Sequence, residues 1–265
     1  MKETVVEAAK KNGVKSILIS QPLPAQPEKS PYIVLGKKHQ IKVDFRPFIQ
    51  VEGIDVKQFR KYKISILDYS AIIFTSRNAI KHFFRICDDL RIKMPQETKY
   101  FCTSEAIALY LQKFILYRKR KVFFGKKGTV QGLKDILKKY KDKETFLFPC
   151  ALGSKSYLPN FLTKNTFSFK NAPMYQTVPC DLSDLEDIFY DMIVFFSPLG
   201  LKSLYHNFPS FEQNDTRIAA FGTTTCKIVE EEYGLRLDIK APSPGSPSMT
   251  MAIDKYIKEV NKKQA

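Results

Sequence analysis

The stretch SAIIFTSRNAIKHFF, residues Ser70–Phe84, returns in altered form as DMIVFFSPLGLKSLY, residues Asp191–Tyr205. Isoleucine, phenylalanine, serine and lysine recur at matching positions in the two copies. Each copy begins with an apolar run typical of a buried strand, and this run ends at a serine where a helical pattern starts. Because a repeat of this kind is one structural unit used twice, the sequence predicts two similar α/β halves.

A second strand-to-helix junction also occurs twice, as YFCTSEAIAL at Tyr100–Leu109 and as AFGTTTCKIV at Ala220–Val229. A weaker third match sets Thr129 opposite Ser248 at the start of the last helix of each half. Serine or threonine at such a junction commonly caps its helix. The free N–H groups and the dipole at a helix N-terminus also bind carboxylates or phosphates. The sequence leaves both interpretations of these hydroxyls open.

The order of the apolar runs predicts that one half is inserted into the other. Two extended, proline-containing segments, Arg46–Glu52 and Pro173–Pro179, could pair with each other and enclose one complete half. The inserted domain is predicted at residues 47–175, and the split domain at residues 1–46 and 176–265. Strands that alternate with helices predict a parallel sheet covered on both faces, with ligands beyond the carboxyl ends of the strands. A two-stranded hinge would let those ends face each other across a cleft.

The inserted domain is predicted to contain the strands Ala71–Phe74, Lys99–Phe101, Lys121–Phe124 and Thr145–Phe148. The split domain is predicted to contain the strands Val14–Ser20, Gln40–Phe45, Met192–Phe196, Arg217–Phe221 and Arg236–Lys240. Its predicted helices are Glu28–His39, interrupted at Pro31, Thr224–Tyr233 and Met249–Lys262.

The chain is strongly basic, with 43 Lys and Arg against 27 Asp and Glu and a net charge of +16. Such a charge indicates an anionic partner, either a polyanionic small molecule or a nucleic acid. The densest basic run, Tyr117–Lys121 followed by Lys126 and Lys127, is also typical of a solvated loop and helix end. No aromatic ladder interleaves this run as single-strand binding requires, so nucleic acid is the less favoured partner.

The sequence offers few other chemical motifs. No apolar run is long enough for a membrane span and no export signal is recognisable. Five widely spaced cysteines without a C-x-x-C pair predict reduced thiols in a cytoplasm. His39, His82 and His206 lie at unrelated positions and are interpreted as surface or core residues. No phosphate-binding, dinucleotide or nucleophile-elbow motif is present, so we expect neither a metal nor a cofactor.

Tyr175 is the most interesting titratable side chain, because it lies in the predicted linker beside the strand ends. Its phenol could donate a proton to a leaving group. Tyrosine also fills the face of a two-stranded ribbon well, so the sequence leaves a purely structural role open.

Four motifs, in their order and spacing, resemble the uroporphyrinogen-III synthase family. They are FTSRNA at Phe74–Ala79, YQTV at Tyr175–Val178, FFSPLG at Phe195–Gly200 and GTTT at Gly222–Thr225. The resemblance covers roughly residues 15–260. It implies two α/β domains, one inserted into the other and joined by a β-ladder. It also implies an activity without a cofactor: hydroxymethylbilane closes to uroporphyrinogen III with loss of water and inversion of the last pyrrole ring, a step of haem biosynthesis.

The resemblance further implies roles for individual residues. Tyr175 would assist departure of the hydroxyl, and Arg217 would add positive charge. The carboxylates of the substrate would be bound by side chains and nearby backbone amides at Thr75, Ser76, Asn78, Thr103, Ser104, Ser197, Arg217, Thr224 and Thr225. We expect a cytoplasmic monomer that makes at most transient contact with the preceding or following enzyme of the pathway.

Two departures from the family pattern stand out. Ser20, Gln21 and Pro22 follow the first strand, where the family often carries arginine, and Glu105 stands where the family commonly has threonine. A carboxylate at that position would repel an anionic substrate unless it is paired or turned away. The alternative function is a basic binding protein for nucleic acid or another polyanion, on the same fold but without turnover. A periplasmic-type ligand-binding module is a third, weaker interpretation.

Overall fold

The computed structural model describes residues 13–125, 128–154 and 157–262, so Lys126 and Lys127 of the basic run lie outside the described residues. The chain divides into two compact units. Unit 1 comprises the chain up to Gln50 and from Val178 onward, and unit 2 comprises Val51–Thr177. The chain passes between the units twice, in β3 (Ile49–Gly53) and in β8 (Phe169–Pro179), which are neighbours in one sheet.

Unit 1 contains a five-stranded sheet in the order β11-β10-β9-β1-β2. All its pairings are parallel. The strands are β1 (Ser16–Ile19), β2 (Lys42–Phe45), β9 (Met192–Phe195), β10 (Arg217–Phe221) and β11 (Ile239–Ala241). The helices are α2 (Pro31–His39), α8 (Pro198–Asn207), α9 (Thr223–Lys227) and α10 (Met249–Lys262). The two N-terminal strands thus complete a sheet whose other three strands come from the C-terminal part of the chain.

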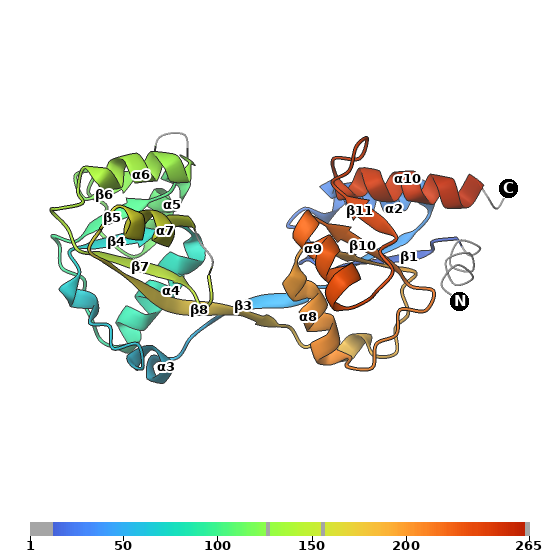
Figure 1. Cartoon of the computed structure of the whole chain (residues 1–265), viewed down its shortest axis with the longest axis horizontal. Helices are drawn as coiled ribbons and strands as arrows, with labels where there is room; N and C mark the ends of the chain where they lie inside the picture. The colour runs from blue at the N-terminus through green and yellow to red at the C-terminus, as the bar shows by residue number, and fades with distance from the viewer. Residues whose placement is uncertain (1–12, 126–127, 155–156, 263–265) are drawn as a thin grey trace. The chain divides into compact units, whose positions relative to one another are not determined.

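Alternate residues of each unit 1 strand face opposite sides of the sheet, and each side packs against its own helices. Ile17 and Ile19 belong to the core beneath α2 and α10, whereas Leu18 belongs to the core beneath α8 and α9. Figure 1 shows α2 and α10 side by side on one face of this sheet. Strands buried on both faces have near-continuous apolar sequences, which is why ILI and MIVF were recognisable as strands.

Unit 2 contains a six-stranded sheet in the order β3-β8-β7-β4-β5-β6. Its remaining strands are β4 (Ala71–Phe74), β5 (Lys99–Cys102), β6 (Val122–Phe124) and β7 (Phe146–Ala151). Its helices are α3 (Val56–Arg60), α4 (Arg77–Asp89), α5 (Glu105–Tyr110), α6 (Val130–Lys138) and α7 (Tyr157–Lys164). Ile72 and Phe74 pack toward α4, while Ala71 and Ile73 pack toward α6 and α7. The predicted fold class, an α/β chain with two mainly parallel sheets, is confirmed. In unit 2, β3 runs antiparallel to β8, since Ile54 N donates to the Met174 carbonyl at 3.1 Å and Cys180 N to the Phe48 carbonyl at 2.9 Å.

Several predicted elements have different bounds in the structure, and two of them differ in an informative way. The strand predicted from Arg236 begins only at Ile239. The backbone of Arg236 is hydrogen-bonded to the Gln213 side chain and not to a neighbouring strand: Arg236 N–H donates to Gln213 Oε1 at 2.7 Å, and Gln213 Nε2 donates to the Arg236 carbonyl at 2.8 Å. The helix predicted from Thr224 begins at Thr223 and changes to a π-helical turn at Ile228–Glu232. Side-chain competition for a backbone group is a tertiary effect that a local apolar pattern does not encode.

All five cysteines are free and buried. Burial raises the pKa of Cys102, at the end of β5, to about 12, so this thiol stays protonated near neutral pH. No helix within the described part of the chain has both the length and the apolar character that a membrane crossing needs.

Asp191 joins the two segments that make up unit 1. Its Oδ2 accepts hydrogen bonds from the backbone N–H of Lys15 and Ser16, at 2.9 and 2.8 Å, and from Ser16 Oγ at 3.0 Å. We expect Asp191→Ala to lower the free energy of unfolding by about 1–3 kcal/mol, because two backbone donors lose their acceptor. Urea denaturation measures this change. Asp191→Asn should cost less, and Asp187→Ala, at an exposed position nearby, should cost little; equal losses in all three would contradict the assignment.

Candidate functional site

In unit 2, a serine lies two residues after the end of each of two neighbouring strands, β4 and β5, and caps the helix that follows. Ser76 caps α4, where its Oγ accepts from Ala79 N at 3.0 Å, and Ser104 caps α5, where its Oγ accepts from Ile107 N at 3.4 Å. Both serines have extended backbones, with φ near −152° and −144°. Because β4 and β5 are parallel and paired, the two caps lie at one edge of the sheet.

The other hydroxyls predicted for unit 2 lie at the same edge. Thr103 is buried, and its Oγ1 donates to the carbonyl of Thr75 at 3.4 Å, which ties the ends of β4 and β5 together. Thr75 is half-buried and Asn78 is exposed in the first turn of α4. The structure therefore brings Thr75, Ser76, Asn78, Thr103 and Ser104 together.

Tyr175 lies at this edge as well, on β8. Its backbone pairs with the end of β7, where its carbonyl accepts from Leu152 N at 2.7 Å. Its phenol oxygen lies 3.3 Å from Ser76 Oγ, within hydrogen-bond distance. The one predicted proton donor of the chain thus meets the hydroxyl that caps α4.

His82 is part of this neighbourhood: it is buried, as the interpretation as a surface or core residue allows, but its contact with Tyr175 was not predicted. Its ring stacks on the Tyr175 ring, with centroids 5.4 Å apart and planes 24° apart. Burial, and then the charges of Arg85 and Lys81, lower the pKa of His82. A signal was available: a histidine falls on the apolar stripe of α4 that contains Ala79, Phe83 and Ile86.

Two charged residues at the helix N-termini complete this edge of unit 2. Arg77 is exposed at the first position of α4, with its guanidinium 5.4 Å from the centre of the Tyr110 ring. Glu105 is exposed at the first position of α5, where an acidic side chain interacts favourably with the helix dipole. The dipole gives a local structural reason for the carboxylate at position 105.

In unit 1, Ser197 repeats the backbone geometry of Ser76 but not its hydrogen bond. It is the N-cap residue of α8 with φ −155° and ψ 155°, and its side chain makes no capping hydrogen bond. Pro198 follows at the first helical position, and Gly200 N donates to the Ser197 carbonyl at 3.1 Å. The half-buried Ser197 hydroxyl is therefore not used by its own helix.

The remaining predicted residues of unit 1 do not form one group. Thr224 is exposed in the first turn of α9, whereas Thr225 is only 3% exposed. Arg217 is 1% exposed at the first residue of β10, and its Nε donates to the Tyr256 hydroxyl at 3.2 Å. Because β10 begins at Arg217, this residue lies at the edge of the sheet opposite to Ser197 and Thr224.

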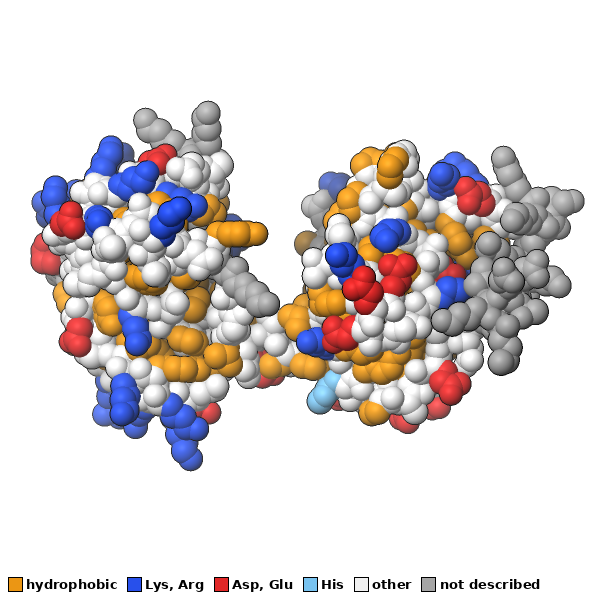
Figure 2. Space-filling view, in the orientation of Figure 1, with side chains coloured by type: hydrophobic (Ala, Val, Ile, Leu, Met, Phe, Trp, Pro, Cys, Tyr) orange, Lys and Arg blue, Asp and Glu red, His pale blue; other side chains and the backbone are white. Residues whose placement is uncertain are grey.

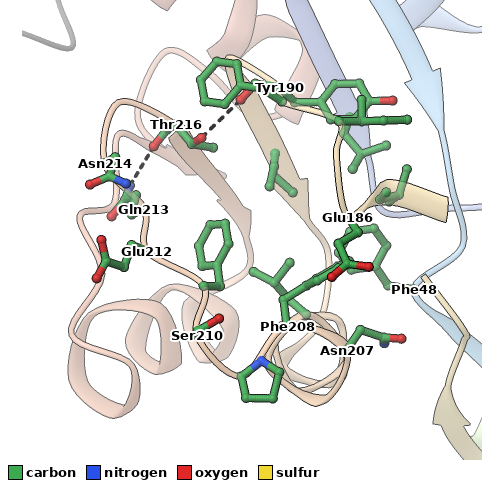
Figure 3. Close-up of a pocket in the computed structure, with 18 residues that line it drawn as sticks. Phe48, Glu186, Tyr190, Asn207, Phe208, Ser210, Glu212, Gln213, Asn214 and Thr216 are labelled. Carbon is green, nitrogen blue, oxygen red and sulfur yellow. Dashed lines mark hydrogen bonds between the residues drawn. The ribbon is translucent and has the colours of Figure 1, made fainter. Parts of the chain in front are cut away.

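A well-formed pocket of about 410 Å³ lies elsewhere in unit 1, at the loops that precede β9 and β10. Figure 3 shows Tyr190 and Thr216 at its wall, joined by a hydrogen bond of 3.2 Å from Thr216 Oγ1 to the Tyr190 carbonyl. The Gln213 amide also donates to the Thr216 carbonyl, at 3.0 Å. None of the predicted site residues lines this pocket, so it is separate from the strand-end hydroxyls.

The different hydrogen bonds of the three capping serines predict different effects on stability. Ser76→Ala and Ser104→Ala should each lower the free energy of unfolding by about 1 kcal/mol, because a helix N–H loses its acceptor. Ser197→Ala should cost clearly less, because its hydroxyl caps nothing. Urea denaturation of the three variants tests this order, and a loss at Ser197 as large as the other two would contradict it.

The chain is similar to a known family in sequence and to solved structures in fold. A sequence model described as Uroporphyrinogen-III synthase HemD matches residues 30–251. No curated protein matches the chain in sequence. The uroporphyrinogen-III synthetase of Helicobacter pylori is 18% identical, with 95% of this chain and 100% of that chain covered and a TM-score of 0.54, which shows a shared fold. A mutant uroporphyrinogen III synthase of Thermus thermophilus is 13% identical, with 92% and 99% covered and a TM-score of 0.48.

Proposed function

Because the chain belongs to the uroporphyrinogen-III synthase HemD family, we propose that it closes hydroxymethylbilane to uroporphyrinogen III, with loss of water and inversion of the last pyrrole ring. The resemblance drawn from the motifs is confirmed at the level of the family. The observation that carries the proposed activity is the 3.3 Å approach of the Tyr175 phenol to Ser76, at the N-terminus of α4.

The substrate is a polycarboxylate, and several features of the chain suit it. Helix N-termini with hydroxyl groups bind carboxylates through free N–H groups and the helix dipole. Ser76 and Asn78 on α4, and Ser197 on α8, are placed at such ends with exposed or half-buried side chains. The net charge of +16 raises the local concentration of an anion. In unit 2 we assign substrate carboxylates to Ser76 and Asn78, with Thr75 and Ser104 at the same edge of the sheet. In unit 1 we assign them separately to Ser197 and Thr224.

In this proposal Tyr175 supplies the proton that the leaving hydroxyl needs. Protonation lets the hydroxyl depart as water and leaves an electrophilic azafulvene on the bilane. The substituted carbon of the last pyrrole ring then bonds to the methylene carbon of the azafulvene and forms a spiro intermediate. The bond from that ring carbon to its original methylene bridge breaks, and the freed bridge bonds to the unsubstituted α-carbon of the same ring, which gives the inverted ring. The phenolate recovers a proton that the closing ring loses. Because the bilane also closes spontaneously without inversion, the enzyme must above all hold the reacting atoms in one arrangement.

Arg217 and Thr225 have a different place in the proposal. Both are buried in unit 1, so we propose that they support the sheet and α9 rather than bind the substrate directly. Arg77, exposed beside Ser76, is proposed as the basic residue that attracts a carboxylate in unit 2.

The alternative, a binding protein without turnover, rests on charge alone. Figure 2 shows the Lys and Arg side chains of unit 2 in several separate groups on the face it displays, rather than in one continuous stripe. Nucleic-acid binding usually shows such a stripe. The cytoplasmic, monomeric state with transient contacts to neighbouring enzymes stays a prediction.

The activity is tested by mixing the protein with hydroxymethylbilane generated enzymatically, oxidising the product and separating the uroporphyrin isomers by chromatography. We expect isomer III to predominate. Isomer I alone, at the spontaneous rate, would refute the proposal. A salt series of oligonucleotide affinity would then test the binding alternative, which predicts a steep loss of affinity with salt.

Tyr175→Phe removes the proton donor and keeps the ring. We expect kcat to fall by about 10²-fold, a typical contribution of general acid catalysis, with KM changed little. Isomer III should still be the main enzymatic product, because the ring and the helix ends still position the bilane. Steady-state kinetics with isomer analysis measures both effects, and an unchanged kcat would exclude the phenol as the donor.

Arg77→Gln removes the exposed charge next to Ser76. We expect KM to rise about three- to tenfold, which corresponds to the loss of an exposed charge interaction of about 1 kcal/mol. The matched control is Lys119→Gln, which removes one charge from the exposed basic run. Equal effects of the two variants would indicate that only the diffuse charge matters.

A further inference from the structure

Helix α4 holds Tyr175 at two points. The Ser76 hydroxyl at the first end of the helix lies 3.3 Å from the phenol oxygen, and the His82 ring further along stacks on the tyrosine ring at 5.4 Å. Helical side chains lean toward the N-terminus of their helix, so the His82 ring leans toward the Ser76 end. The tyrosine therefore lies along the helix, with its ring and its hydroxyl fixed separately.

His82 is itself held between its own helix and strand β3. It is 6% exposed, and its Nδ1 has no hydrogen-bond partner among the described residues. Gly53 of β3 lies directly against it: a Cβ atom added there would come within 2.6 Å of His82 Nδ1 and 2.7 Å of Arg85 Nε. Arg85 in turn is fixed by hydrogen bonds to the Ile54 carbonyl and to Asp89. The imidazole thus has no room to swing toward β3.

The contact with Tyr175 is made by the face of the imidazole ring. A buried nitrogen without a hydrogen bond destabilises the fold, and an apolar ring would fill the same space without that cost. The charged groups around the ring also favour the neutral imidazole. Lys81 and Arg85 are on its own helix, β8 presents the Tyr175 phenol, and β3 presents Gly53, preceded by the exposed Glu52.

The geometry points to His82 as a positioning residue that, through ring stacking, holds the Tyr175 phenol at Ser76. This inference rests on the proposed function, in which the phenol donates the proton. It adds a requirement that the family assignment does not contain: the stacked ring at position 82 must be neutral and held in place by a residue without a side chain at position 53.

The main test compares His82→Ala with His82→Phe. We expect His82→Ala to lower kcat about tenfold or more with KM little changed, because the phenol loses its fixed position. His82→Phe restores a stacking ring and should bring kcat back to within about twofold of the wild type. The matched control is His206→Ala, at an exposed position on α8, which should leave both constants unchanged. A wild-type kcat in His82→Ala, or an equal loss in both His82 variants, would overturn the inference.

The pH dependence separates positioning from packing. The folded protein lowers the pKa of His82 below its ordinary value near 6.5. The free energy of unfolding therefore falls as the pH drops below about 6.5 toward the lowered pKa, because the unfolded chain takes up the proton more readily than the folded one. We expect kcat and the free energy of unfolding of the wild type to decrease at acidic pH. In His82→Phe, which has no group that titrates at this position, the part of each decrease that is due to His82 should be absent. Identical acid limbs in the two proteins would contradict the role of the neutral imidazole.

A variant at Gly53 tests the position of the His82 ring from strand β3. Gly53→Ala should lower kcat without touching Tyr175, because the new methyl group displaces His82. In a His82→Ala background the same change should cost less, since the displaced ring is absent. Additive effects of the two changes would mean that Gly53 and His82 act independently, which contradicts the inference.

One readout does not depend on activity. NMR of tyrosine-labelled protein, with the Tyr175 signal assigned from Tyr175→Phe, follows the chemical shift of this ring without substrate. We expect a clear shift in His82→Ala and a smaller one in His82→Phe. If the wild type makes no isomer III but the shifts follow this order, the proposed function fails and the positioning contact stands. If isomer III forms and the chemical shift of Tyr175 is the same in the wild type and in both His82 variants, the positioning inference alone fails.

Discussion

Burial of both faces of two parallel sheets is the constraint on which the rest of this structure depends. Strands such as MIVF send alternate side chains to opposite faces, so each unit needs helices on both sides. Parallel strands also need long crossovers, which here are the helices. Helices that follow a parallel strand, such as α4, α5 and α8, therefore start at the carboxyl edge of their sheet. This edge gathers free N–H groups and hydroxyls because of the topology, without any contribution from charged side chains.

The two units use this edge differently although their backbones are alike. Ser76 and Ser197 share nearly the same φ and ψ, but only the Ser76 hydroxyl bonds to its helix and also meets a phenol. In unit 1 Pro198 and a backbone hydrogen bond to the Ser197 carbonyl leave the serine hydroxyl unused by α8. A duplicated junction thus brings a capping serine into contact with a phenol in unit 2 and leaves a serine hydroxyl that its own helix does not use in unit 1.

The arrangement of side chains that holds the Tyr175 ring lowers the stability of the fold. A buried imidazole whose Nδ1 finds no hydrogen-bond partner in the described part of the chain, beside the guanidinium of Arg85, is unfavourable for the fold by itself. Gly53 accommodates it by having no side chain where a Cβ atom would collide with both groups. Local arrangements that cost stability are found preferentially at functional sites, because selection tolerates the cost there. The strong positive charge of the chain acts at longer range and needs no such arrangement.

The sequence by itself determined the repeat, the strand-helix alternation and the clustering of strand-end hydroxyls, because apolar periodicity and capping residues are local signals. It also pointed to Tyr175, through its place in an extended linker. Only the tertiary structure decided which side chains meet: His82 on Tyr175, Gly53 against His82, and Arg217 bonded to Tyr256 inside unit 1. These contacts join residues far apart in the chain, and their outcome depends on burial and packing that no single segment encodes.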